Sequence, residues 1–110
     1  MRSYLADEIL PSDIKKIDEF LRQHAMISPL EKFYWARLPE DLLSELQARH
    51  AACQPHVFGI ELGDDRMKME FYIHSLKNMS CSCQNYCTPE QRAFILNLAD
   101  RIITDLEIRT

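Results

Sequence analysis

Glycine is scarce in this sequence, which has only Gly59 and Gly63 among its 110 residues. Loops that cradle phosphate groups need several closely spaced glycines, so a nucleotide site of that kind is excluded. The sequence also lacks the Gly-x-Ser-x-Gly turn of serine hydrolases and the His-Glu-x-x-His motif of zinc proteases. A domain this short offers no recognisable substrate cleft. We therefore expect a protein that is not an enzyme.

Long apolar runs and a concentrated positive charge are also missing. No apolar stretch approaches the roughly 20 residues that span a bilayer. The first ten residues, MRSYLADEIL, carry Asp7 and Glu8 where a signal peptide has a continuous apolar region. Lysine and arginine are scattered and the net charge is −4, whereas nucleic-acid binding needs a basic face. We expect a cytoplasmic protein that binds neither a membrane nor a nucleic acid.

The overall composition is that of one globular domain. Hydrophobic residues make up 46% and charged residues 27% of the chain, which are ordinary values for folded proteins. A length of 110 residues is close to the commonest size of a domain. We therefore treat residues 1–110 as a single domain.

Capping signals and apolar spacing predict four helices. They cover the segment PSDIKKIDEFLRQH, residues 28–38 from the capping-box sequence SPLE, residues 39–53, and residues 89–106. The last helix has the clearest signals: Thr88 as the cap, Pro89 at the first helical position and Gln91 closing the capping box. The second helix would carry the aromatic triplet at positions 33–35.

The middle of the chain predicts an antiparallel hairpin of residues 57–62 and 67–74. The preferred register sets Leu62 opposite Met67, Ile60 opposite Met69, Phe58 opposite Phe71, Glu61 opposite Lys68 and His56 opposite Ile73. It gathers the apolar side chains on one face and pairs opposite charges on the other. Two strands alone would be marginally stable without a cover. The expected fold is therefore α+β, in the order α-α-α-β-β-α, with the helices packed on the apolar face of a small hairpin sheet.

Cysteine is the most unusual feature of the sequence. Three of the four cysteines, Cys81, Cys83 and Cys87, lie within the stretch NMSCSCQNYCTPEQ. The first strand of the hairpin starts just after Cys53, and the second ends just before Cys81. An antiparallel pair places those two ends together, so we expect Cys53 to lie beside the other three. In a reducing compartment such cysteines are thiols or metal ligands rather than structural disulfides.

The four cysteines supply the ligand set of a structural zinc site. Such a site needs four sulfur or nitrogen ligands in a closed tetrahedron. Cys53, Cys81, Cys83 and Cys87 would form it, and a histidine could substitute for one of them. The possible substitutes are His50, His56 and His74. An iron–sulfur cluster is the less favoured cofactor, because the cysteine spacing differs from that of bacterial ferredoxins.

Two other interpretations of the cysteines remain open. The first is a thiol-based redox sensor or carrier that uses Cys81, Cys83 and Cys87. Here Cys87 would be the most reactive thiol, because it directly precedes a helix whose positive end stabilises a thiolate. The second is an accessory subunit whose cysteines bind no metal and have no function.

The aromatic residues Phe33, Tyr34 and Trp35 suggest a contact with another protein. They cannot all face the same side of a helix, so at least one is expected at the surface, where aromatic side chains anchor interfaces. The sequence therefore favours a small metal-stabilised cysteine-cluster module that acts in protein–protein interaction or regulation.

Overall fold

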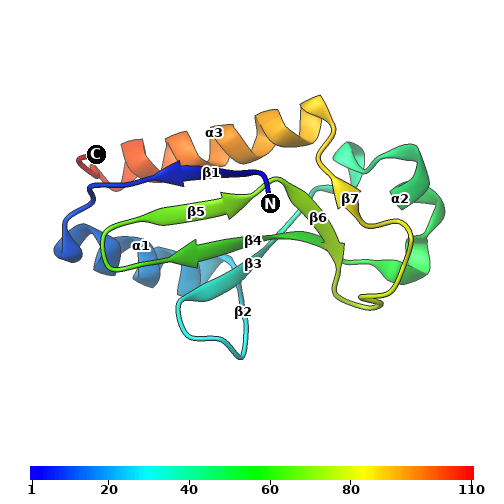
Figure 1. The fold of residues 1–110 in the computed structure, drawn as a ribbon, viewed down its shortest axis with the longest axis horizontal. Helices are drawn as coiled ribbons and strands as arrows, with labels where there is room; N and C mark the ends of the chain where they lie inside the picture. Colours follow the sequence, from blue (N-terminus) through cyan, green and yellow to red (C-terminus); the bar gives the residue numbers. More distant parts are fainter.

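An antiparallel sheet of seven strands is the centre of the computed structural model, which describes residues 1–110 (Figure 1). The strands are β1 (Ser3–Ala6), β2 (Met26–Ile27), β3 (Phe33–Arg37), β4 (His56–Leu62), β5 (Met67–Glu70), β6 (Tyr72–Ser75) and β7 (Asn85–Tyr86). The main path of the sheet runs β1-β5-β4-β3-β2. β6 pairs with the other end of β4, and β7 pairs with β6. β4 is therefore the strand that connects the two parts of the sheet.

Two long helices cover one face of this sheet. They are α1 (Pro11–His24) and α3 (Pro89–Asp105), which run along opposite margins of the sheet in Figure 1. α3 begins as predicted, with Pro89 in its first turn and a complete capping box between Thr88 and Gln91. The remaining helical segments are short: η1 (Glu40–Leu42), α2 (Glu45–Arg49) and η2 (Ala51–Cys53). None of the helices is both long and apolar enough to cross a membrane.

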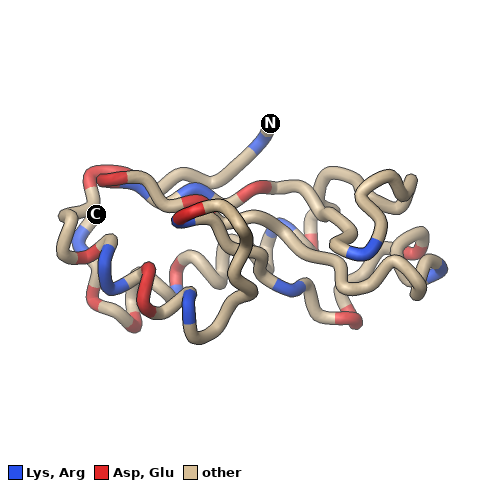
Figure 2. The backbone as a smooth tube through the Cα atoms, turned by 90° about the horizontal axis from the view of Figure 1, so that it is seen from below, with Lys and Arg blue, Asp and Glu red and all other residues tan.

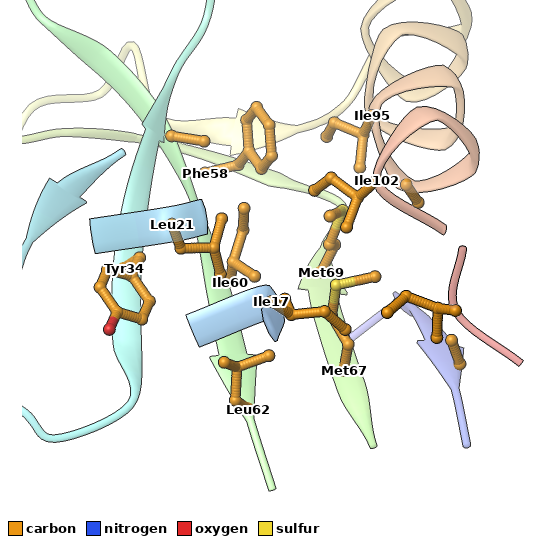
Figure 3. Close-up of a cluster of buried hydrophobic side chains, with 14 of the residues drawn as sticks. Ile17, Leu21, Tyr34, Phe58, Ile60, Leu62, Met67, Met69, Ile95 and Ile102 are labelled. Carbon is orange, nitrogen blue, oxygen red and sulfur yellow. The ribbon is translucent and has the colours of Figure 1, made fainter. Parts of the chain in front are cut away.

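The core lies between the sheet and the two long helices (Figure 3). The sheet contributes Tyr34, Ala36, Phe58, Ile60, Leu62, Met67 and Met69. The helices contribute Ile14, Ile17 and Leu21 from α1 and Ile95, Ala99 and Ile102 from α3. Side chains of both helices surround Ile60 and Met69 in Figure 3, so one continuous core holds the two layers together. The opposite face of the sheet has no covering helix.

The predicted order α-α-α-β-β-α is wrong, because the order of the strands and α-helices is β-α-β-β-α-β-β-β-β-α. Residues 33–37 form β3 instead of a helix. In this strand Tyr34 and Ala36 face the core, while Phe33 and Trp35 point to the other face. This alternation is the period of a strand, and aromatic residues favour strands. The Ser28 hydroxyl, expected to cap a helix, donates instead to the Phe33 carbonyl within a turn.

Two further segments also differ from the predicted fold. The helix expected over residues 39–53 is divided into η1, α2 and η2. The division follows from Ser44, whose side chain starts a new helix through a capping box with Gln47. The N-terminal residues, for which no element was predicted, form β1 and pair with β5.

The predicted hairpin register is confirmed near the turn and wrong beyond it. Ile60 pairs with Met69, and Leu62 with Met67. Further along, Val57 pairs with His74 and His56 with Ser75, so the register has moved by two residues from the expected pairing of His56 with Ile73.

Phe71 causes this shift in register. It leaves the ladder of β4: its N–H donates to the Arg2 carbonyl, and its carbonyl accepts from the Cys87 N–H. The expected pairing of Phe58 with Phe71 is therefore absent. The neighbouring Glu70 side chain crosses β4 at Gly59, where a Cβ atom would lie only 2.1 Å from Glu70 Oε1.

Charged residues of both signs are interspersed along the chain (Figure 2). Glu61 and Lys68, which face each other across the hairpin, approach to 3.8 Å between Oε1 and Nζ. Both side chains are largely exposed, so this ion pair adds little to stability. The apolar core is thus the main stabilising contribution.

The central position of Ile60 gives a test of this core. Ile60 is completely buried, so Ile60→Ala should lower the free energy of unfolding by about 2–5 kcal/mol. Urea denaturation of the wild type and the variant measures this difference. Glu61→Ala, the neighbouring change on the uncovered face, should cost less than about 1 kcal/mol. Equal effects of the two substitutions would contradict the assignment of the covered face.

Candidate metal centre

Three cysteines meet at the end of the sheet where β6, β7 and α2 lie (Figure 1). Cys53 ends η2, three residues before β4 begins at His56, whereas Cys81 and Cys83 belong to the loop between β6 and β7. The three Sγ atoms all lie within 4.8 Å of one another, and those of Cys53 and Cys81 are 3.1 Å apart. The antiparallel pairing of β4 with β6 thus brings Cys53 to Cys81 and Cys83, as the hairpin predicts. We call these three residues the cysteine group.

Hydrogen bonds of two polar side chains fold the loop that carries Cys81 and Cys83. The buried Ser75 hydroxyl donates to the Cys53 carbonyl and accepts from the Asn78 N–H at 3.0 Å. The Gln84 amide accepts from the Ser75 N–H at 2.9 Å and donates to the Met79 carbonyl at 2.7 Å. Both ends of the loop are therefore attached to Ser75, the last residue of β6. Ser75 also connects the loop to Cys53 through its hydrogen bond to the Cys53 carbonyl.

Two buried glutamines connect the cysteine group to the helices. Gln47 donates from Nε2 to the Cys83 carbonyl at 3.3 Å, and its Oε1 accepts from Gln91 Nε2 at 2.9 Å. Each glutamine also closes the capping box of its own helix, Gln47 in α2 and Gln91 in α3. Gln47 was not among the predicted site residues, although the sequence SELQ has the form of a capping box. The position of Cys83 is therefore tied to the starts of both helices.

Among the three thiols, Cys81 ionises most readily. Hydrogen bonds from the Cys83 side chain, the Cys83 N–H and the Cys53 side chain lower the pKa of Cys81 to about 7. Burial, followed by the neighbouring Cys81, raises the pKa of Cys83 to about 12. The hydrogen bond to Cys81, followed by burial, raises the pKa of Cys53. Ionising all three thiols together therefore requires a cation among them.

His56 lies directly beside the cysteine group. Its Nε2 is 3.4 Å from Cys83 Sγ, and only 1% of the residue is exposed. Its Nδ1 is buried and has no hydrogen-bond partner. Burial, and then the nearby His50, lower the pKa of His56, so its ring is neutral at pH 7. A neutral ring beside Cys83 can either donate to the sulfur or accept from it.

The other two predicted histidines differ in their surroundings. His50 ends α2, and its Nδ1 lies 2.7 Å from the Leu46 carbonyl oxygen. The electrostatic effect of His50 is one of the smaller causes that lower the pKa of Cys81. His74 lies on the uncovered face of the sheet, where its Nε2 is 3.0 Å from Glu70 Oε2 and its ring contacts Trp35 and Tyr72. The structure does not bring His74 to the cysteine group.

Cys87 is also outside the cysteine group. Its N–H donates to the Phe71 carbonyl at 3.0 Å, and its side chain packs against the hydrophobic core. Burial raises the pKa of Cys87 to about 11. The predicted reactive thiolate at the start of α3 is therefore wrong, because desolvation outweighs the effect of the helix end.

The aromatic triplet is divided between the two faces of the sheet. Tyr34 is buried and donates from its hydroxyl to Asp18 Oδ1 at 2.5 Å. Phe33 and Trp35 lie on the uncovered face, with ring centroids 5.0 Å apart. Only these two of the three residues are therefore placed for a contact with a partner.

The difference in pKa between Cys81 and Cys87 predicts an order of thiol reactivity. In metal-free protein at pH 7, a substantial fraction of Cys81 should be thiolate because its pKa is about 7, whereas Cys87, with a pKa of about 11, should be almost entirely protonated. Iodoacetamide should therefore modify Cys81 first. Because the thiolate form increases as pH rises through about 7, the rate should increase between pH 6 and 8 and then level off. Mass spectrometry of peptides from quenched samples measures both rates. Modification of Cys87 before Cys81 would contradict the assignment.

The chain matches no protein-family model, no curated protein and no solved structure. The function must therefore be inferred from the geometry of the chain itself. Its main chemical feature is the group of three thiols, which two distant segments contribute and buried hydrogen bonds hold in place.

Proposed function

We propose that this protein binds one zinc ion through Cys53, Cys81 and Cys83, and that the ion stabilises the fold. The observation that carries the proposal is the approach of the three Sγ atoms to within 4.8 Å of one another. Cysteine sulfurs that bind a tetrahedral ion each lie at about 2.3 Å from the ion. The distances between such sulfurs therefore also fall below this limit. Only small movements of the side chains would be needed for all three to bind.

Zinc is the metal that this ligand set favours. Thiolates are soft ligands that suit zinc, copper(I) and iron–sulfur clusters. An iron–sulfur cluster is bound by four ligands spread around several iron atoms, and Cys87 is not part of the group. The closely spaced thiols, of which Cys53 and Cys83 are buried, fit a single ion better.

A bound ion would join the end of η2, which carries Cys53, to the loop that follows β6. In the sheet, these two segments are held near each other by the pairing of β4 with β6. Between β6 and β7 the loop of residues 76–84 contains no helix or strand. An ion shared by this loop and Cys53 would close it onto the end of η2. The free energy of metal binding at such a site is partly free energy of folding.

We further infer that the zinc-stabilised protein acts by contact with another protein. Phe33 and Trp35 support this inference, because they lie on the sheet face that no helix covers. Aromatic side chains are enriched at the centres of interfaces. The absence of a glycine-rich loop or a known catalytic motif agrees with a binding role rather than an enzymatic one.

A thiol switch is the second candidate function, and the 3.1 Å between the sulfurs of Cys53 and Cys81 favours it. Hydrogen peroxide would oxidise these two thiols to a disulfide and would itself be reduced to two molecules of water. The disulfide would remove two of the three thiolates, so it would also prevent metal binding. The two functions therefore exclude each other at any one moment.

Metal analysis tests the zinc proposal. Protein purified without an affinity tag should contain about one equivalent of zinc, measured by inductively coupled plasma mass spectrometry. Cys83→Ser should lose most of the metal, because a structural site depends on each of its thiolates. Removal of the zinc with a chelator should lower the melting temperature of the wild type.

Cys87→Ser is the matched control, because it removes a cysteine from the same segment but not from the group. It should keep its zinc and its chelator-dependent melting temperature. Equal loss of zinc from Cys83→Ser and Cys87→Ser would contradict the proposal. Absence of any bound metal, combined with a Cys53–Cys81 disulfide after mild peroxide treatment, would instead favour the thiol switch.

A further inference from the structure

A hollow lies on the covered face of the sheet, between α1 and α3. Its volume is about 230 Å³, and seven of the nine residues around it are hydrophobic. Six of these hydrophobic residues form its walls and floor: Phe20 and Leu21 of α1, Ala36 and Ile60 of the sheet, and Leu98 and Ile102 of α3. We propose that this hollow binds a small carboxylic acid, with the hydrocarbon chain between the helices and the carboxylate on Arg101. The inference concerns none of the cysteines and does not rest on the proposed zinc site.

The hollow is apolar from its inner end to its opening. Leu21, Ile60 and Ile102 form the inner end, where each residue is at most 2% exposed. These three side chains are labelled in Figure 3, which shows them coming from α1, the sheet and α3. Phe20 and Leu98 are half-buried and flank the opening from opposite helices. A hydrocarbon chain that enters here therefore exchanges water for apolar contacts on both sides.

Two alanines leave this space unfilled. Ala36 faces the core from β3, two residues after Tyr34, whose large ring reaches α1 and donates from its hydroxyl to Asp18. Ala25, directly after α1, contributes only a methyl group at the opening. Larger residues at these two positions would occupy the space between the helices. The hollow therefore follows from the small side chains at Ala25 and Ala36.

The volume of the hollow sets the size of its ligand. An apolar cavity of about 150 Å³ binds one benzene molecule, which has six carbon atoms. By the same ratio, a volume of about 230 Å³ holds roughly nine carbon atoms. Each methylene group that is removed from water strengthens binding by about fourfold. A chain of about eight carbon atoms therefore gains most of the available contact without extending beyond the hollow.

Arg101 determines the charge of the head group that fits. Arg101 and His24 are the two polar residues around the hollow, and no acidic residue lines it. Arg101 is exposed and belongs to none of the ion pairs of the chain, so its guanidinium is free to bind an anion. The planar guanidinium matches the two oxygen atoms of a carboxylate. A neutral head group would leave this charge unpaired, and a cationic one would be repelled.

An NMR titration with octanoate tests the inference. Octanoate should shift the methyl signals of Leu98 and Ile102, and should leave unchanged those of Leu10, an exposed residue outside the hollow. 1-Octanol and octylammonium carry the same chain with a neutral and a cationic head group, and both should bind more weakly than octanoate. Acetate has the head group without the chain, so it should shift neither of the two methyl signals.

Arg101→Gln removes the positive charge but keeps a polar side chain. It should weaken octanoate binding roughly 2- to 5-fold, the range of an exposed ion pair, and should leave octanol binding unchanged. Arg92→Gln is the matched control, because Arg92 is also exposed on α3 but does not line the hollow. This variant should bind both ligands as the wild type does.

Two further variants fill the hollow. Leu98→Trp and Ala25→Leu enlarge a half-buried side chain at the opening, and the amide spectrum of each verifies that it is folded. Each should weaken the binding of octanoate and octanol alike by about 10-fold or more, the effect of excluding two methylene groups from the hollow.

The inference is overturned if octanoate shifts no methyl group of the hollow, if octanol binds as tightly as octanoate, or if Arg101→Gln and Arg92→Gln have equal effects. Octanoate binding that is unchanged in both filled variants would also overturn it. Zinc content is measured separately on the same protein, so such a failure would leave the zinc proposal unaffected.

Discussion

The antiparallel pairing of β4 with β6 holds the candidate site together. Val57 opposite His74 and His56 opposite Ser75 bring the start of one strand beside the end of the other. Cys53 precedes the first strand, and Cys81 and Cys83 follow the second, so the pairing determines where all three sulfurs lie. The Ser75 hydroxyl, which donates to the Cys53 carbonyl, strengthens the same junction. Without this pairing the three cysteines would be connected only by a long stretch of chain.

The site is also coupled to the hydrophobic core through Gln47 and Gln91. Both side chains are buried. The oxygen of each accepts from the backbone at its own helix cap, and the nitrogen of each donates to another segment. Buried polar groups are costly unless they are satisfied, so a displacement of Cys83 would leave Gln47 without its partner. Through Gln91 the effect would reach α3, whose Ile95 and Ile102 form part of the core. Order in the cysteine loop and stability of the domain are therefore linked.

The two faces of the sheet have different chemistry. The covered face is apolar and contacts α1 and α3, and it accounts for most of the stability that the domain gains from burial. The uncovered face carries Phe33, Trp35, Tyr72 and His74 in a row of ring contacts, next to the Glu70 carboxylate. Polar and aromatic side chains that remain partly exposed are suited to contact another molecule without weakening the core. The zinc proposal and the partner proposal thus concern separate regions of the domain.

The sequence by itself determined the features that depend on local patterns. Alternation of apolar residues predicted the register of Ile60 with Met69, and capping residues predicted the start of α3. The hairpin then predicted that Cys53 lies near Cys81. Local patterns failed for residues 33–37. The capping-box form of SPLE predicted a helix there, although the alternation of the side chains is that of a strand. The strand forms because β4 supplies its hydrogen-bond partners.

Only the tertiary structure decided the composition of the candidate site. The two-residue shift at Phe71 depends on hydrogen bonds with Arg2 and Cys87, which are distant in the chain. The same contact draws Cys87 against the core and away from the other cysteines, although it is only four residues from Cys83. The spacing of the residues also does not reveal that a carbonyl oxygen reaches His50 Nδ1 or that His56 Nδ1 is buried without a partner. Spacing in the sequence determines which residues can meet, and burial and hydrogen bonding determine which of them can bind a metal.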